Sequence, residues 1–241
     1  MDRTEELSRL NGFPVYSSLD RRYRNYGRVI TALDVADLIN CSKTQTGIPA
    51  EGNVYVPSFP PFEELPVTMQ IRDVCFGGLP LQAGYCNGRN TTFNGFEYHK
   101  VPEINVAVSE FCLALGHSWE ISTGLTYDVS QAEVFYVPQG TVFEIYGTTL
   151  HLSPLRTLEE GFRDIVILPR GTNTPLSEDE RAAASAAFAG GEKEARLLLQ
   201  KHKWVISHPE RAPLMKQGAH PGVTGINTEL KYRASTGGVE K

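Results

Sequence analysis

The sequence predicts a mainly β protein that forms one domain. All-β barrels commonly use chains of this length, 241 residues, as a single domain. The 22 glycines and 15 prolines favour many short strands and turns over long helices. Between about residues 67 and 168, short runs of Val, Ile, Phe, Tyr and Thr alternate with turn-forming residues such as Pro138-Gln-Gly140. This pattern is typical of a sandwich or barrel of antiparallel strands.

Two helices are expected before the strands. Residues 2–11 form a weak charged helix, and Ala32–Cys41 has the apolar spacing of a short amphipathic helix. Five prolines then fall between Ile48 and Pro66, which favours an extended wrapping segment. The barrel core is expected over about residues 67–170.

A further helix is expected after the strands. The segment Pro175–Gln200 begins with a Ser177–Glu180 capping pair, breaks at Gly190-Gly191 and resumes afterwards. We therefore expect a helical segment at about residues 176–202. The C-terminal tail, residues 203–241, has several glycines and prolines and is expected to wrap on the barrel, with residues 234–241 frayed.

The composition excludes several classes of function. Lys and Arg number 23 against 28 Asp and Glu, a net charge of −5 without a basic block, so no nucleic-acid partner is expected. No run of about 18 apolar residues exists, which predicts no membrane-spanning segment. The N-terminal sequence MDRTEELSRL lacks the pattern of a signal peptide, which predicts a cytoplasmic protein. The four cysteines form no C-x-x-C pair and are expected to be reduced thiols.

The most informative stretch is Gly95–Asn105. If it is one strand, then side chains alternate between its faces, and one face carries Glu97, His99, Glu103 and Asn105. Two carboxylates and an imidazole on one face suit a divalent transition metal. The alternative is a polar stripe that faces solvent, which antiparallel strands commonly have.

A second stretch strengthens the metal interpretation. Two apolar runs flank Pro138-Gln-Gly140, and Thr149, His151 and Ser153 share one face of the strand that follows. The spacing E-x-H-x-x-x-E, followed about 35 residues later by P-x-G and a strand with histidine, resembles the motifs of the cupin superfamily. The resemblance implies a double-stranded β-helix (cupin) barrel with flanking helices and a metal between the two motifs. This chain departs from the pattern, because Glu97 and Phe143 replace the usual histidines.

Two ligand sets follow from this resemblance. The favoured set is Glu97, His99, Glu103 and His151, with Glu144 as an inward carboxylate that acts as general base. In the alternative, Glu144 is the fourth ligand and His151 transfers the proton.

Longer strings resemble a bacterial cupin family of sulfoquinovose isomerases. They are Tyr98-His-Lys-Val-Pro-Glu-Ile-Asn105, Gly147-Thr-Thr-Leu-His-Leu-Ser-Pro154, Leu168-Pro-Arg-Gly-Thr-Asn-Thr-Pro175 and Lys203-Trp-Val-Ile-Ser-His-Pro-Glu210. The resemblance implies an aldose–ketose isomerase that converts sulfoquinovose to 6-deoxy-6-sulfofructose, works as a homo-oligomer and moves a proton through a cis-enediol. We expect Mn²⁺, with Zn²⁺ or another divalent ion as alternatives, to polarise the substrate oxygens. Glu144 and Glu103 are the expected catalytic carboxylates.

Five further residues are candidates for substrate binding: Arg89, Arg156, Asn105, His220 and Trp204. The two arginines could bind an anionic sulfo-sugar, although surface arginines are more often simply solvated. Trp204 could line a sugar pocket or pack the tail against the barrel. Other functions stay open, namely an epimerase, lyase or dioxygenase on the same barrel, or a sugar-binding cupin without catalysis.

Overall fold

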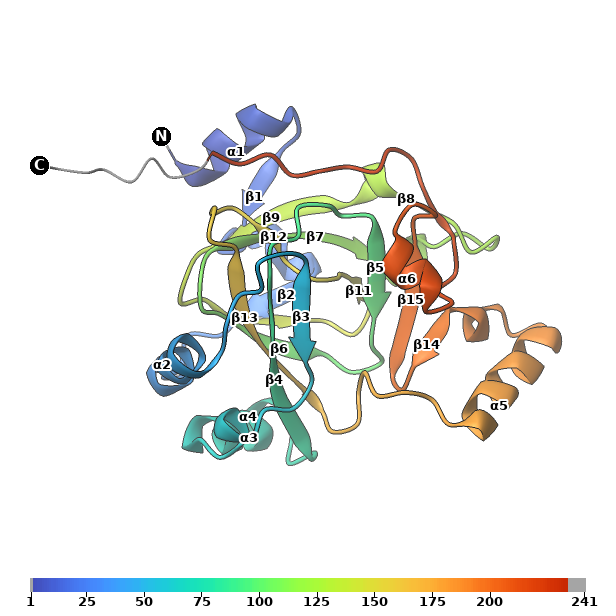
Figure 1. Cartoon of the computed structure of the whole chain (residues 1–241), viewed down its shortest axis with the longest axis horizontal. Coiled ribbons are helices and arrows are strands. Elements are labelled where there is room, and N and C mark those ends of the chain that lie inside the picture. The colour runs from blue at the N-terminus through green and yellow to red at the C-terminus, as the bar shows by residue number, and fades with distance from the viewer. Residues whose placement is uncertain (1, 234–241) are drawn as a thin grey trace, which may run out of the picture.

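The computed structural model describes residues 2–233 and shows a barrel of two β-sheets with helices around it (Figure 1). The first sheet has the strand order β2-β10-β6-β13-β4-β3, and the second has β1-β9-β7-β11, with β12 also paired to β7. Their bounds are β1 Val15–Ser17, β2 Gly27–Val29, β3 Asn53–Val56, β4 Leu81–Gly88, β6 Glu103–Ala107, β7 Phe111–His117, β9 Glu133–Val137, β10 Val142–Ile145, β11 Thr149–Leu150, β12 Leu155–Arg156 and β13 Phe162–Pro169.

The order of the strands identifies the barrel as a double-stranded β-helix. The eight barrel strands, in chain order, are β4, β5 (Gly95–Tyr98), β6, β7, β9, β10, β11 and β13. In the first sheet the sixth, third, eighth and first of these strands (β10, β6, β13 and β4) are neighbours. The fifth, fourth and seventh are neighbours in the second sheet, and the second, β5, joins the seventh through a bridge between Glu97 and His151. This is the arrangement of jelly rolls and cupins, so the cupin fold expected from the sequence is confirmed.

Alternating side chains divide the barrel into an interior and two outer faces. Strand β6 shows the division, because Ile104 and Val106 pack outward while Glu103 and Asn105 point inward. The interior is apolar at one end, where Phe111, Phe143 and other aromatic rings meet. The polar side chains of β6 therefore lie at the other end of the same interior.

The helices differ from the sequence expectation before the barrel. Helix α1 (Arg3–Asn11) is as expected, and α2 (Ala36–Gln45) begins later than expected because the Asp34 carboxylate accepts the Ala36 N–H. The proline-rich segment is extended in β3 but not throughout, because it also contains α3 (Pro60–Glu63) and ends where α4 (Pro66–Cys75) begins. Proline stands at the start of both helices, where its missing N–H costs nothing. The strands of the barrel core therefore begin at Leu81 instead of residue 67.

The segment after the barrel is only partly helical. Helix α5 (Glu178–Ala189) begins with the expected capping box. After Gly191, however, come a 3₁₀ turn, Lys193–Leu197, and two strands, β14 (Leu198–Gln200) and β15 (Lys203–Ser207). Strand β15 pairs with β5, and this pairing buries Val205 and Ile206 instead of extending a helix.

The described part of the tail then crosses the barrel. It forms α6 (Ala212–Lys216) and β16 (Val223–Thr224), which pairs with β8 (Tyr127–Asp128), and Leu230 donates its N–H to Thr91. Residues 234–241, expected to fray, lie outside the described residues. The remaining 3₁₀ turns are Arg21–Asn25, Ser118–Glu120 and Val129–Gln131.

The four cysteines are free thiols. Within residues 2–233, none of the helices has the length and apolar character that crossing a membrane requires.

Candidate metal centre

The stretch Gly95–Asn105 is not one strand. Strand β5 ends at Tyr98 and β6 begins at Glu103, and the two strands belong to different sheets. The turn between them nevertheless preserves the predicted face, because Glu97 and His99 from one side and Glu103 from the other meet inside the barrel. The prediction of a shared polar face was therefore right in outcome, although the reason was a turn between two sheets.

His151 joins these residues through backbone pairing. Glu97 donates its N–H to the His151 carbonyl at 2.6 Å, and His151 donates its own to Glu97 at 3.0 Å. Glu97, His99 and His151 each offer a buried ligand atom, and these atoms lie within 4.8 Å of one another. The Glu103 Oε2 atom lies 3.5 Å from His99 Nε2 and 3.4 Å from His151 Nε2. The buried Glu–His–His group could hold a metal ion.

The orientation of the two imidazoles supports this fit. His99 Nδ1 lies 2.7 Å from the His202 carbonyl, and His151 Nδ1 lies 2.8 Å from the Thr149 carbonyl. Carbonyl oxygens only accept, so both Nδ1 atoms donate and each Nε2 is left to act as a ligand. Both Nε2 atoms are buried and make no hydrogen bond. Such an arrangement is costly unless something else binds there.

The electrostatics of the cluster also attract positive charge. Burial opposes ionisation of Glu103, but His151 and His99 lower the pKa of this carboxyl well below its usual range. Burial likewise opposes protonation of His151, yet the charges of Glu103 and Glu97 raise the pKa of its imidazole to about 9. Lys203 adds an ion pair, with its Nζ 2.5 Å from Glu97 Oε2. A divalent cation would take the place of the proton on His151.

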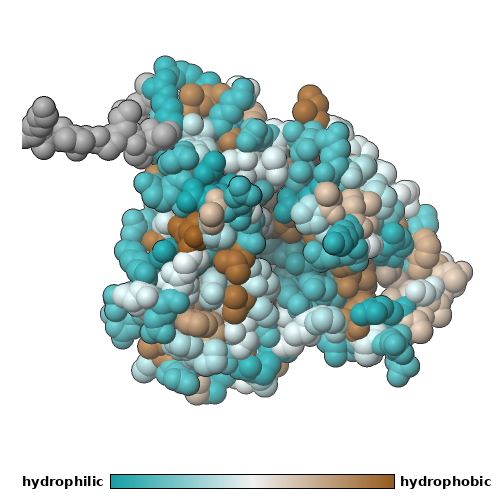
Figure 2. Space-filling view, viewed as in Figure 1, coloured by the Kyte–Doolittle hydropathy of each residue, from teal (hydrophilic) through white to brown (hydrophobic). Residues whose placement is uncertain are grey.

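A cavity of about 260 Å³ opens onto the cluster. Figure 2 shows the hollow near the centre of the view, between β3 and α6. Carboxylates, amides and cations share its wall with apolar side chains such as Leu113 and Val166. The polar lining residues are Asn53, Tyr55, Glu97, Glu103, Asn105, His151, Ser153, Asp164, Asn173, Lys203, Arg211 and Gln217.

Glu144 does not reach this cavity, which corrects the assignment of Glu144 as general base or alternative ligand. In the pairing of β10 with β6, Ile145 lies opposite Glu103 and Glu144 lies opposite Ile104, so Glu144 shares the outer face. There its carboxylate pairs with Arg28 at 2.5 Å. The prediction was wrong by one residue along β10. Phe143 and Ile145 point into the barrel, so Glu144 between them points outward.

Of the five predicted substrate residues, only Asn105 lines the cavity, where its Nδ2 donates to Glu103 Oε1 at 2.9 Å. Arg89 is held by the Pro49 and Glu159 carbonyls and lines a neighbouring cavity. Arg156 lies over the Tyr232 ring, and His220 bonds the Leu125 carbonyl. Trp204 stacks on Tyr98 and so packs the tail against β5, the alternative expected from the sequence.

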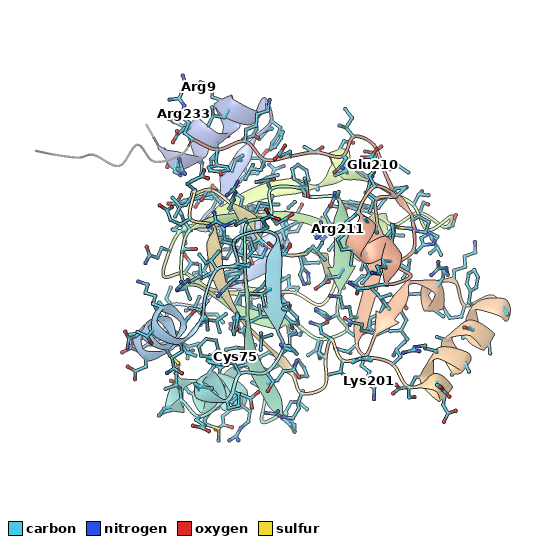
Figure 3. All side chains as sticks on the ribbon, viewed as in Figure 1. Arg9, Cys75, Lys201, Glu210, Arg211 and Arg233 are labelled. Carbon is cyan, nitrogen blue, oxygen red and sulfur yellow. The ribbon has the colours of Figure 1, made fainter. Side chains whose placement is uncertain are left out.

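Several cavity residues were not predicted. Asp164 had a detectable signal, because it is a carboxylate beside the apolar run Ile165–Leu168. No sequence pattern marked Tyr55, Asn173 or Arg211, because tertiary contacts bring them to the cavity from β3, a turn and the start of α6. Figure 3 labels Arg211 between β3 and α6.

Comparison with known proteins adds a family and distant structural similarities. The sequence model of a family described as "Domain of unknown function (DUF4867)" matches residues 15–228. No curated protein matches the chain.

Among solved structures, a salicylate 1,2-dioxygenase from Pseudaminobacter salicylatoxidans is similar, with 12% identity over 55% of this chain and 30% of that chain, and a TM-score of 0.29. A vicilin from Solanum melongena has 14% identity over 71% and 46%, with a TM-score of 0.32. A vicilin from Corylus avellana has 16% identity over 69% and 47%, also with a TM-score of 0.32. The chain spans less than half the length of each of these proteins.

Proposed function

The chain belongs to the DUF4867 family, and we propose that it is a metal-dependent enzyme that interconverts an aldose and a ketose. One observation carries the proposal: a buried cluster of Glu97, His99 and His151, with Glu103 beside it, borders a polar cavity that Glu97, Glu103 and His151 line. The volume of the cavity restricts the substrate to a small molecule, and the amides and hydroxyls that line the cavity suit a polyhydroxy compound.

Glu97, His99, Glu103 and His151 would hold the ion, and Mn²⁺ or Zn²⁺ suits this mixed set of oxygen and nitrogen donors. When bound, the cation would polarise two vicinal oxygens of the substrate. Asn105 keeps Glu103 in place through its Nδ2, so that the other carboxylate oxygen faces the two imidazoles.

We assign the proton transfer between C2 and C1 to Asp164, in place of Glu144. Asp164 lines the cavity, is almost fully buried, and its Oδ1 has no hydrogen-bond partner. Burial, together with the negative charge of Glu103, raises the pKa of this carboxyl well above its usual range. In its ionised form, a carboxyl with a raised pKa is a stronger base than an ordinary aspartate, so it is suited to accept a proton from carbon, hold it and return it to the neighbouring carbon.

The narrowest form of the proposal is the conversion of sulfoquinovose to 6-deoxy-6-sulfofructose. Arg211 supports it better than Arg89 or Arg156, because it lines the cavity and its buried Nε has no hydrogen-bond partner, while one terminal nitrogen donates to Asn94. Its guanidinium could donate hydrogen bonds to a sulfonate. A homo-oligomeric state and a cytoplasmic location remain predictions.

A second candidate is a non-haem iron oxygenase. Glu97, His99 and His151 have the two-histidine, one-carboxylate composition of such sites. Oxygen uptake by the Fe²⁺-loaded protein, without exchange of sugar hydrogens, would favour this candidate.

The isomerase proposal is tested by hydrogen exchange in D₂O. We expect the Mn²⁺-loaded protein to incorporate deuterium at C1 or C2 of at least one sugar from a panel of aldoses and their 6-sulfo forms, followed by NMR. Asp164→Asn should slow the exchange by about 10²–10⁴-fold, whereas Glu144→Gln should leave it nearly unchanged. No exchange with any sugar, or loss of exchange in Glu144→Gln alone, would contradict the proposal.

A further inference from the structure

Two adjacent turns at the cavity have unusual backbone conformations. Asn173 and His202 have φ angles of 65° and 58°, and they are two of three non-glycine residues with positive φ among residues 2–233. The turns are joined, because Asn173 donates its N–H to the Lys201 carbonyl at 3.0 Å and Lys201 donates to the Thr174 carbonyl at 2.9 Å. Backbone strain of this kind often occurs where a side chain must be held for function.

The side chain of Asn173 is held against Tyr55. Its Nδ2 donates to the Tyr55 hydroxyl oxygen at 2.7 Å. Because this oxygen accepts, the hydroxyl proton is free for another acceptor, and none is found among residues 2–233. The Asn173 Oδ1 is buried without a partner, in a residue that is only 9% exposed. The pair thus presents one free donor and one free acceptor, and both residues line the cavity.

We propose that Tyr55 and Asn173 form a subsite for one neutral alcohol hydroxyl of the substrate. An alcohol can accept from the Tyr55 hydroxyl and donate to Asn173 Oδ1 at the same time. A carbonyl, carboxylate, phosphate or sulfonate oxygen cannot donate to Oδ1, and an ammonium group cannot accept from Tyr55. The subsite therefore selects for a hydroxyl-bearing substrate and against one that carries an anion at this position.

The location of the pair suits a substrate that also reaches the metal cluster. Tyr55 lies on β3 and is 38% exposed as a whole residue, while its hydroxyl bonds Asn173. Burial of the hydroxyl raises the pKa of Tyr55, the hydrogen bond from Asn173 partly opposes this, and the charges of Glu103 and Glu97 raise the pKa further, so the hydroxyl remains a donor. That the bound alcohol belongs to a sugar rests on the proposed function, whereas the binding of an alcohol hydroxyl does not.

The test is the binding of three hexitols, sorbitol, mannitol and galactitol, to the Zn²⁺-loaded protein, measured by ligand-observed NMR. We expect at least one to bind, and Tyr55→Phe to weaken it by about tenfold or more, since an unpaired polar group is left behind. Asn173→Gly tolerates the positive φ and should weaken binding similarly. Tyr232→Phe is the matched control, because its hydroxyl bonds Glu159 outside this cavity.

Each outcome decides the question, provided that zinc content and melting temperature match the wild type. Absence of hexitol binding by the wild type, or equal binding by Tyr55→Phe and Asn173→Gly, would overturn the subsite. Isomerase activity with normal KM in both variants would likewise overturn it while leaving the proposed function intact. Loss of hexitol binding in a protein without isomerase activity would support the subsite and contradict the proposed function.

Discussion

At the scale of single residues, the site depends on buried polar groups that lack a protein partner. His99 and His151 each fix one ring nitrogen on a backbone carbonyl and leave the other unbonded. Asp164 is buried without a partner for Oδ1. Such groups lower the stability of the fold and are retained where they bind or transfer something.

Asp164 therefore makes stability depend on pH. Burial raises the pKa of Asp164 in the folded state above its unfolded value, so the folded protein retains this proton more tightly. This tighter proton binding stabilises the folded protein fully at pH values below the pKa that Asp164 has in the unfolded state. The stabilisation is lost as the pH rises toward the pKa of Asp164 in the folded state, at up to about 1.4 kcal/mol per pH unit. Asp164→Asn removes this dependence.

Urea unfolding of chelator-treated protein at several pH values between 4 and 8 measures this effect. We expect Asp164→Asn to become progressively more stable than the wild type as pH rises. A difference in the free energy of unfolding that stays constant over this range would show that Asp164 has an ordinary pKa.

At the scale of elements, one hairpin completes the site. Strand β15 pairs with β5, its Lys203 contacts Glu97, and the preceding His202 carbonyl holds His99. The sequence predicted a helix up to residue 202, because EKEARLLLQKH is rich in helix formers. Pairing with β5 and burial in the core outweigh that local preference.

Packing of this hairpin can be tested at Ile206. Its side chain is 1% exposed in a core shared with Phe96 and Tyr127. Ile206→Ala should reduce the free energy of unfolding by about 2–5 kcal/mol. Ile226→Ala, at a residue that is 81% exposed, should change it by less than about 0.5 kcal/mol. Similar values for both variants in denaturant titrations would mean that β15 is not packed on the barrel.

At the scale of the whole molecule, motif spacing predicted the barrel and the cluster Glu97, His99 and His151, although a turn after β5, and not one continuous strand, places His99 and Glu103 on the shared face. The same reasoning failed at Glu144, where an error of one residue moves a side chain to the opposite face. The rest of the cavity wall could not be predicted. Tyr55, Asn173 and Arg211 come from the edge strand β3, a turn and the start of α6, and only the tertiary fold places them together.

The most direct test is titration of chelator-stripped protein with Mn²⁺ and Zn²⁺ by calorimetry. The wild type and His208→Ala, whose imidazole lies outside the cluster, should each bind one ion per chain. His99→Ala and His151→Ala should bind it about 100-fold more weakly or not at all. Absence of binding by the wild type, or equal binding by all four proteins, would contradict the account.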